Sequence, residues 1–184
     1  MAANHLAMGM VVLVAMRGSA SARIAEPKAE VRISLIDSDR VGGTSLPVAK
    51  AVAARILAAT GARVHWSEGD AAGAIVIRFL DFAPEKQPPD TLAQASPYAT
   101  SGVGITVFLD RVWAFANHQP FFQPRILGHV LAHEIGHVLR GTNGHSWTGV
   151  MKAHWDDADY RAMLARGLTF TAEDVVDIRA RLTH

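Results

Sequence analysis

Apolar residues recur with two different periods along this chain. In some segments they alternate with polar residues or run continuously with many β-branched side chains, as in β-strands; these are residues 30–37, 63–67, 74–81 and 104–112. In others they recur every three or four positions, as on one face of an α-helix; these are residues 45–60, 121–140 and 172–182. Four prolines between residues 84 and 97 mark a loop, and a short edge strand is expected near residues 98–101.

Residues that favour helix starts and stops lie at the ends of these segments. Ser45 is expected to cap a helix, Pro47 suits its first turn, and Gly61 suits the end of the same helix. Thr171 and Asp174 have the spacing of a capping box, with Asp in place of the usual Glu. The order strand–helix–strand–strand–strand–helix, followed by a C-terminal helix, predicts an α+β fold. We expect a twisted mixed sheet of four to five strands with the helix of residues 121–140 packed on one face.

Composition restricts the class of protein. The chain has 184 residues, of which 49% are hydrophobic and 19% charged, as expected for one globular domain with its own core. The net charge of +1 gives no reason to expect nucleic acid or an anionic membrane as a partner. The absence of cysteine excludes disulfides, thiolate metal ligands and a thiol nucleophile. Composition does not indicate the oligomeric state.

The N-terminal segment predicts export. Residues 6–16 form an apolar run that is short for a membrane span, and Ala20 and Ala22 then have the Ala-x-Ala spacing of a signal-peptidase site. No lysine or arginine precedes the run, so an ordinary apolar strand or helix is the alternative. We expect a signal peptide of residues 1–22, cleaved after Ala22, and a single domain of residues 23–184. The mature protein would be secreted or periplasmic, with no membrane span.

The helix of residues 121–140 contains the sequence His133-Glu134-Ile135-Gly136-His137, an HExxH motif. Two histidines four positions apart lie on the same helical face, so both imidazoles can bind one metal ion. A zinc ion held there acidifies its bound water, and Glu134 can accept the proton as that water attacks a carbonyl. The alternative is a helix with two surface histidines and an unrelated glutamate.

A third metal ligand is expected after this helix. Gly141 suits the left-handed position that ends a helix, so the chain can reverse and bring His145 to the two motif histidines. Three protein ligands leave a fourth position for water, as in catalytic zinc sites. A ligand between His154 and Asp159 is the main alternative, and Glu173 is another. His129 shares the helical face, but the helix rises about 12 Å from His129 to His137, which is too far for one ion to bind all three histidines of the helix.

These residues resemble the zinc peptidases called metzincins, in particular their matrixin branch. The family pattern is HExxHxxGxxH, followed by a methionine-containing turn beneath the metal. The resemblance implies that His133, His137 and His145 are the zinc ligands and that Glu134 is the general base. It also implies that Met151 is the turn methionine, a packing residue. In this chain the third histidine follows the second by eight positions, so the turn is two residues longer than the family pattern.

The expected function is hydrolysis of peptide bonds by a zinc metalloendopeptidase with one catalytic Zn²⁺. The resemblance implies that an extended peptide substrate pairs with a sheet edge at residues 98–104, for which an ordinary edge strand is the alternative. Lys152, His154 and Trp155 would wall a pocket beside the metal. The acidic residues between Asp156 and Asp159 favour a helix cap over a calcium site. The alternatives are a non-catalytic zinc-binding protein of the cell envelope, a zinc hydrolase with a non-peptide substrate, and a metal-free binding domain.

Overall fold

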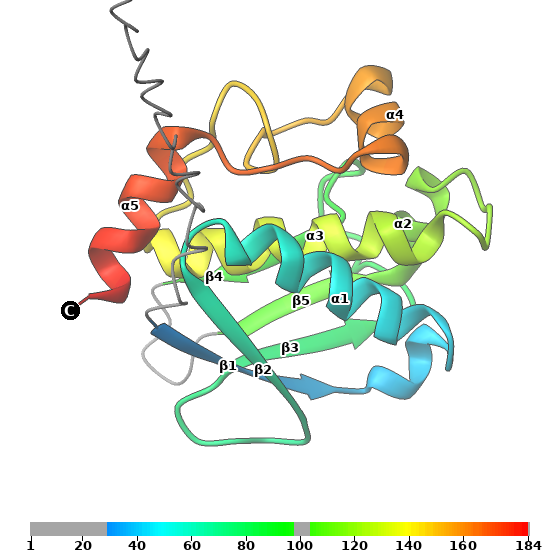
Figure 1. Cartoon of the computed structure of the whole chain (residues 1–184). Helices are drawn as coiled ribbons and strands as arrows, with labels where there is room; N and C mark the ends of the chain where they lie inside the picture. Colours follow the sequence, from blue (N-terminus) through cyan, green and yellow to red (C-terminus); the bar gives the residue numbers. More distant parts are fainter. Residues whose placement is uncertain (1–28, 98–103, 184) are drawn as a thin grey trace, which may run out of the picture.

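The computed structural model describes residues 29–97 and 104–183, which form a five-stranded sheet with helices on one face (Figure 1). The strands are β1 (Ala29–Ile36), β2 (Ala62–Glu68), β3 (Ile75–Leu80), β4 (Ala93–Ser96) and β5 (Gly104–Phe108). Their order in the sheet is β2-β1-β3-β5-β4. Neighbouring strands from β2 to β5 are parallel, whereas β4 runs antiparallel to β5. The expected mixed sheet of four to five strands is therefore confirmed.

Alternation along the strands separates a buried face of the sheet from a polar one. Successive side chains of a strand point to opposite faces, and in β1 the buried residues flank the exposed side chain of Arg32. In β3 the buried residues likewise flank exposed Arg78. Eight buried hydrophobic side chains of β1, β3 and β5 belong to the core cluster under the helices; they are Val31, Ile33, Leu35, Ile75, Ile77, Phe79, Ile105 and Val107.

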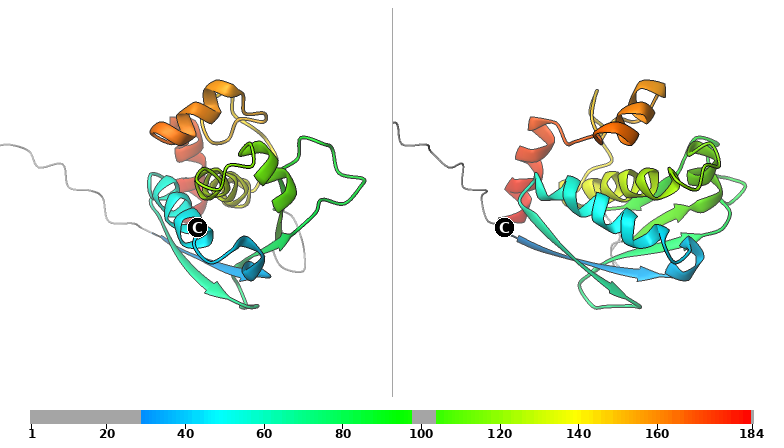
Figure 2. Two further views of the ribbon diagram at one scale, coloured as in Figure 1. Left: turned by 90° about the vertical axis from the view of Figure 1, so that its right-hand side faces the viewer. Right: turned by 45° about the vertical axis from the view of Figure 1, so that its right-hand side comes forward.

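Five α-helices and a short 3₁₀ helix accompany the described strands. They are η1 (Ser38–Val41), α1 (Ser45–Ala58), α2 (Leu109–Phe115), α3 (Gln123–Arg140), α4 (Asp157–Ala165) and α5 (Ala172–Leu182). Helices α1 and α3 lie side by side above the sheet (Figures 1 and 2). A Cβ atom built on Gly128 of α3 would lie 2.6 Å from Cβ of Val52 and 2.9 Å from the carbonyl oxygen of Ala49. A glycine therefore allows the close approach of α3 to α1.

Helix α3 is buried through its centre. Every residue from Ile126 to His137 is buried, because α3 lies between the sheet, α1 and the chain that follows it. A helix that is buried on all sides holds its side chains in fixed rotamers by close packing. The predicted motif helix therefore provides a rigid support for the residues of the HExxH sequence.

Two elements differ from the sequence-based expectation. The predicted strand at residues 104–112 ends at Phe108, where its partner β3 also ends at Leu80. The next residues form α2, because buried Leu109, Val112 and Ala116 have helical spacing. The predicted order of elements contained no helix at the position of α4, although the acidic residues before it favoured a helix cap. The predicted edge strand at residues 98–101 lies outside the described residues, and the edge strand that the structure describes, β4, comes earlier in the chain.

The predicted helix ends are mostly confirmed. Thr171 and Asp174 form a full capping box at the start of α5, and α3 ends at Gly141 in the left-handed conformation with φ of 57°. Asp156 caps α4, as expected for the acidic residues there. At α1, by contrast, the N-cap residue is Thr44, and its side chain makes no capping hydrogen bond.

Within residues 29–97 and 104–183, no helix combines the length and the apolar character that a bilayer span requires. The predicted signal peptide of residues 1–22 lies outside the described residues.

Candidate metal centre

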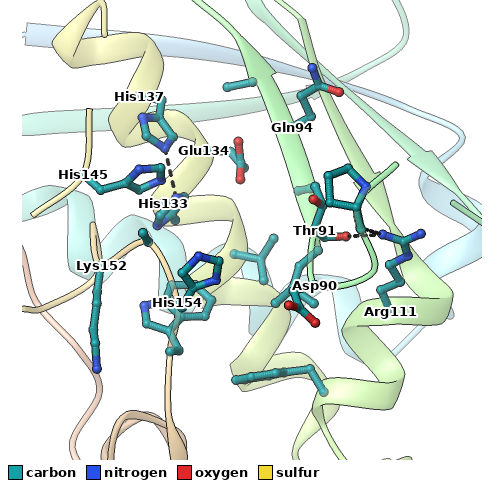
Figure 3. Close-up of a pocket in the computed structure, with 18 of the residues that line it drawn as sticks. Asp90, Thr91, Gln94, Arg111, His133, Glu134, His137, His145, Lys152 and His154 are labelled. Atoms are coloured by element: carbon teal, nitrogen blue, oxygen red, sulfur yellow. Dashed lines mark hydrogen bonds between the residues drawn. The ribbon is translucent and has the colours of Figure 1, made fainter. Parts of the chain in front are cut away.

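Helix α3 and the loop after it bring three imidazoles to one point (Figure 3). His133 and His137 come from successive turns of α3, and His145 comes from the loop. One ring nitrogen from each lies within 4.8 Å of the others. His133 and His137 are buried, whereas His145 is exposed. The structure therefore groups the three histidines that the sequence singled out, and the group could hold a metal ion.

Two backbone carbonyls orient the imidazoles of the motif. Nδ1 of His133 lies 2.7 Å from the carbonyl oxygen of Val150, and Nδ1 of His137 lies 2.9 Å from that of Thr142. A carbonyl oxygen can only accept, so both Nδ1 atoms carry a hydrogen and donate it. Burial lowers the pKa of His133 to about 3 and that of His137 to about 4. Both rings are therefore neutral at pH 7, and each Nε2 has a free lone pair.

The two free lone pairs lie close together. Nε2 of His133 and Nε2 of His137 are 3.0 Å apart. Neither Nε2 carries a hydrogen in this tautomer, so no hydrogen bond joins them, and the contact is repulsive unless a cation lies between them. Two nitrogen ligands of a tetrahedral zinc ion, with bonds of about 2.0–2.1 Å, would be about 3.3 Å apart. The spacing of the two nitrogens thus fits two ligands of one zinc ion.

The loop that carries His145 is closed by backbone hydrogen bonds. The ring of His145 lies 4.8 Å from that of His137 and 5.4 Å from that of His133, between centroids. The amide of Thr142 donates to the carbonyl of His137 at 3.2 Å, and the amide of Ser146 donates to the carbonyl of Met151 at 2.9 Å. The two additional residues in the turn therefore do not prevent His145 from reaching the other two histidines.

Met151 packs beneath α3. Its side chain is completely buried, and a Cβ atom on Gly136 would lie 2.6 Å from its sulfur. Gly149, two residues earlier, has φ of +78°, and a Cβ there would lie 2.4 Å from the carbonyl oxygen of Thr169. This turn therefore requires a glycine, and Met151 has the packing role that the resemblance implied.

Glu134 is buried between α3 and β4. Its side chain points from the helix toward the strand that carries Gln94 (Figure 3). Burial raises the pKa of Glu134 to about 8, and a hydrogen bond from the backbone amide of Ala95 opposes that rise. In the absence of a cation this carboxyl group binds a proton readily, and a nearby cation would lower its pKa.

A cleft of about 820 Å³ opens beside the three histidines and Glu134. Strand β4 and the loop before it form one side, and the segment after Met151 forms the other; the lining residues of that segment are Lys152, Ala153, His154 and Trp155. Lys152 is held by Asp156 at 2.7 Å and by Asp159 at 2.5 Å. The ring of Trp155 packs edge-on against His133, with 5.4 Å between centroids. The expected wall is therefore present beside the three histidines.

The other candidate ligands either lie apart from the three-histidine group or already use their nitrogen atoms in other hydrogen bonds. His129 is fully buried, its Nδ1 lies 2.7 Å from the carbonyl of Arg125, and its Nε2 accepts from the amide of Leu168 at 3.0 Å. Both of its nitrogens are therefore used in packing, as expected. His154 lines the cleft without joining the group, and Glu173 is an exposed residue of the first turn of α5.

Sequence reasoning missed the network behind His145. Asp174 was recognised as a helix-capping residue, but its contacts with Arg140 and Ser146 were not expected. Asp174 lies 28 positions after Ser146 and still further from Arg140, and no spacing pattern links it to either residue. A buried charged pair is visible only once α5 is packed against the end of α3.

Comparison with known proteins adds a likeness of fold. No protein-family model matches the sequence, and no curated protein matches it significantly. Twelve chains of solved structures match this fold. One is metalloproteinase-II from Bacteroides fragilis, with a TM-score of 0.52 and 13% sequence identity over 87% of this chain and 55% of that one. This chain thus spans about half the length of that protein. At this identity the likeness shows the fold alone: a mixed sheet with helices packed on it, of the metalloproteinase type.

Proposed function

We propose that this protein is a zinc-dependent metallopeptidase that hydrolyses peptide bonds in the cleft beside His133, His137 and His145. The observation that carries the proposal is the pair of free Nε2 lone pairs 3.0 Å apart, beside a buried glutamate. A structural zinc site usually has four protein ligands and needs no base. Three histidines with an adjacent carboxyl group are instead the composition of a catalytic site.

Each residue of the site has a separate role in the proposed hydrolysis. The three histidines would hold the ion, which when bound supplies a Lewis acid that polarises water and the carbonyl of the scissile bond. Glu134 accepts a proton from the attacking water and passes it to the leaving amine. The carbonyl groups of Val150 and Thr142 keep the first two imidazoles in the tautomer that presents Nε2.

The edge of β4 is the proposed site for the substrate backbone. β4 is an edge strand of the sheet, and its residues Ala93, Gln94 and Ala95 line the cleft. The amide of Ala95 donates to Glu134, so this edge of the strand faces the general base. An extended peptide can pair with such an edge and become an additional strand. We place the substrate here, a few residues before the segment 98–104 expected from the sequence.

We also propose that the protein is exported and acts as a secreted or periplasmic enzyme. The support is the apolar run at residues 6–16 followed by the Ala-x-Ala sequence that ends at Ala22. N-terminal sequencing of protein recovered outside the cytoplasm tests this part. A mature chain that begins at Arg23 would agree with the proposal, and an intact N-terminus would contradict it.

Cleavage of a diverse peptide mixture, read by mass spectrometry, tests the activity. The zinc-loaded protein is compared with Glu134→Gln, which keeps the shape of the side chain and removes the base. Metal content is measured for both. We expect each protein to contain one zinc ion, and only the original protein to cleave the peptides. If both bind zinc and neither cuts, the activity proposal fails, and a non-catalytic zinc protein or a hydrolase of another substrate takes its place.

A further inference from the structure

A second cavity lies between α1, α3 and the chain that follows α4. Its volume is about 600 Å³. It is lined by one face of α1, by the N-terminal half of α3 and by four residues at the end of α4 and just after it. These four are Met163, Ala165, Arg166 and Gly167. These elements lie next to one another in Figures 1 and 2. The two cavities share no lining residue, so this one is separate from the metal centre.

Three arginines from three different elements line this cavity. Arg55 comes from α1, Arg125 from the first turn of α3, and Arg166 directly follows α4. Arg125 also donates to the carbonyl of Leu164. No aspartate or glutamate lines the cavity, and within the described chain no ion pair involves any of the three arginines. Three cationic side chains thus line one cavity without a carboxylate beside them, and those of Arg55 and Arg166 are exposed, so an incoming anion can reach them.

The remaining polar groups add no negative charge. Both nitrogens of His129 at the inner wall are hydrogen-bonded, so this ring is neutral. Pro47 lies in the first turn of α1 and Arg125 in the first turn of α3. Helix N-termini carry partial positive charge, although Pro47 has no amide hydrogen and the amide of Arg125 already donates to the carbonyl of Phe122 at 3.0 Å. The cavity therefore has a positive potential from both its side chains and its backbone.

Part of the cavity wall is apolar. Val48 is 45% exposed, which is a large exposure for an aliphatic side chain, and Ala51 and Met163 lie in the same wall. Gly167 has φ of +86°, and a Cβ there would lie 3.5 Å from Nε2 of His129 and 3.6 Å from Nη2 of Arg55. Both would be ordinary van der Waals contacts, so it is the left-handed φ that favours glycine here, next to the guanidinium group of Arg55.

We propose that this cavity binds an organic phosphate monoester, with its phosphate group against Arg55, Arg125 and Arg166 and its apolar group against Val48 and Met163. Guanidinium groups bind phosphate oxygens with paired, charge-assisted hydrogen bonds. A phosphate dianion balances two of the three positive charges, whereas a monocarboxylate balances one. The apolar wall favours an ester over inorganic phosphate. This site is independent of the proposed peptidase activity.

Isothermal titration of the full, zinc-loaded chain with phenyl phosphate tests the proposal. Arg55→Gln and Arg166→Gln remove one charge each from the cavity. Arg161→Gln removes the same charge from an exposed position of α4 that does not line it. We expect saturable binding at one site that weakens at least about tenfold in each of the first two variants and is unchanged in the third. Phosphate bound at the zinc ion would survive all three substitutions, so the comparison isolates the cavity.

Thermal unfolding gives a second readout that a purely structural arginine would not produce. Without ligand, Arg55→Gln should unfold at the same or a higher temperature than the original protein, because repulsion among the three cations is relieved. With phenyl phosphate, only the original protein and Arg161→Gln should gain stability. The proposal is overturned by an absence of saturable binding, by equal weakening in Arg161→Gln, or by tighter binding of benzoate than of phenyl phosphate.

Discussion

The carboxylate of Asp174 accepts a hydrogen bond of 2.6 Å from the hydroxyl group of Ser146, the residue that follows His145. Asp174 is completely buried, and the same carboxylate oxygen lies 3.4 Å from Nη1 of Arg140. That nitrogen of Arg140 also donates to the carbonyl of Gly144 at 3.0 Å. One carboxylate of the C-terminal helix thus anchors both sides of the residue that would be the third ligand.

Loss of this anchor should weaken metal binding. In Asp174→Asn the ion pair with Arg140 is lost, so the loop that carries His145 is held less firmly. Groups that orient metal ligands typically contribute about 10–100-fold to metal affinity. We expect a loss in that range for Asp174→Asn and a smaller loss for Ser146→Ala, measured by competition with a chromophoric zinc chelator.

The matched control for this prediction is Asp177→Asn. Asp177 also pairs with Arg140, at 3.6 Å from Nη2, but its side chain is 49% exposed. An exposed ion pair of this kind contributes little, so zinc affinity should change by less than about twofold. Equal losses in Asp174→Asn and Asp177→Asn would show that general charge around Arg140, and not the anchor, controls affinity.

Two glycines of α3 should respond differently to a methyl group. A Cβ on Gly128 would meet Cβ of Val52 and the backbone of Ala49, so α1 must shift. A Cβ on Gly136 would meet the sulfur of Met151 at 2.6 Å and Cε1 of Phe170 at 2.9 Å, but both are side-chain atoms, and the flexible thioether can adjust more easily than a helix backbone. We expect Gly128→Ala to lower the free energy of unfolding by about 1–3 kcal/mol, and Gly136→Ala to lower it by less.

Urea unfolding of the purified variants measures these changes. The control is Gly43→Ala, because a Cβ there would meet no atom within 4 Å and its φ is not in the left-handed range. Its stability should be unchanged or slightly higher. A neutral Gly128→Ala would mean that α1 and α3 are not closely packed at this point.

The sequence predicts the helical part of the centre well because its geometry is local. His133 and His137 share a face through the helical repeat, and Gly141 ends the helix through its own backbone conformation. The position of Met151 follows from a short turn. The resemblance to metzincins then predicts the fold, because the order of strands and helices is preserved even where individual boundaries differ.

The features that sequence reasoning missed depend on contacts between distant parts of the chain. Strand β4 (Ala93–Ser96) contains only small or polar residues, and it is recognisable as a strand only through its pairing with β5. The strand predicted at residues 104–112 becomes helix α2 after Phe108, because β3 offers no partner beyond Leu80. Likewise, nothing local indicates that Asp174 contacts Ser146, 28 positions earlier.

The identity of the third ligand can be tested directly. His145 lies with His133 and His137, whereas His154 only lines the cleft. We therefore expect His145→Ala to lose more zinc affinity than the roughly 100-fold reached by residues that only orient ligands. His154→Ala should bind zinc as tightly as the original protein does. Chelator competition on both variants measures this, and the reverse order would place the third ligand after Met151.

The stability of the metal-free protein should depend on pH through His129. Burial, followed by the positive charges of Arg55 and Arg125, lowers the pKa of His129 from 6.5 to about 4. The folded state therefore binds a proton less readily than the unfolded chain does. The contribution of His129 to the free energy of unfolding is fully present above pH 6.5 and is lost as the pH falls toward 4. At pH 5 the loss amounts to about 2 kcal/mol.

The variant His129→Gln can accept and donate hydrogen bonds in the same place but does not titrate. Its free energy of unfolding should therefore fall less between pH 7 and pH 5 than that of the original protein, by about 2 kcal/mol. Both proteins must be free of zinc, because protonation of His133 and His137 also competes with metal binding. Those two histidines are present in both proteins, so their titration cancels in the comparison. Parallel pH profiles would show that His129 is not held neutral by its surroundings, which would remove the electrostatic link between this ring and the neighbouring arginines.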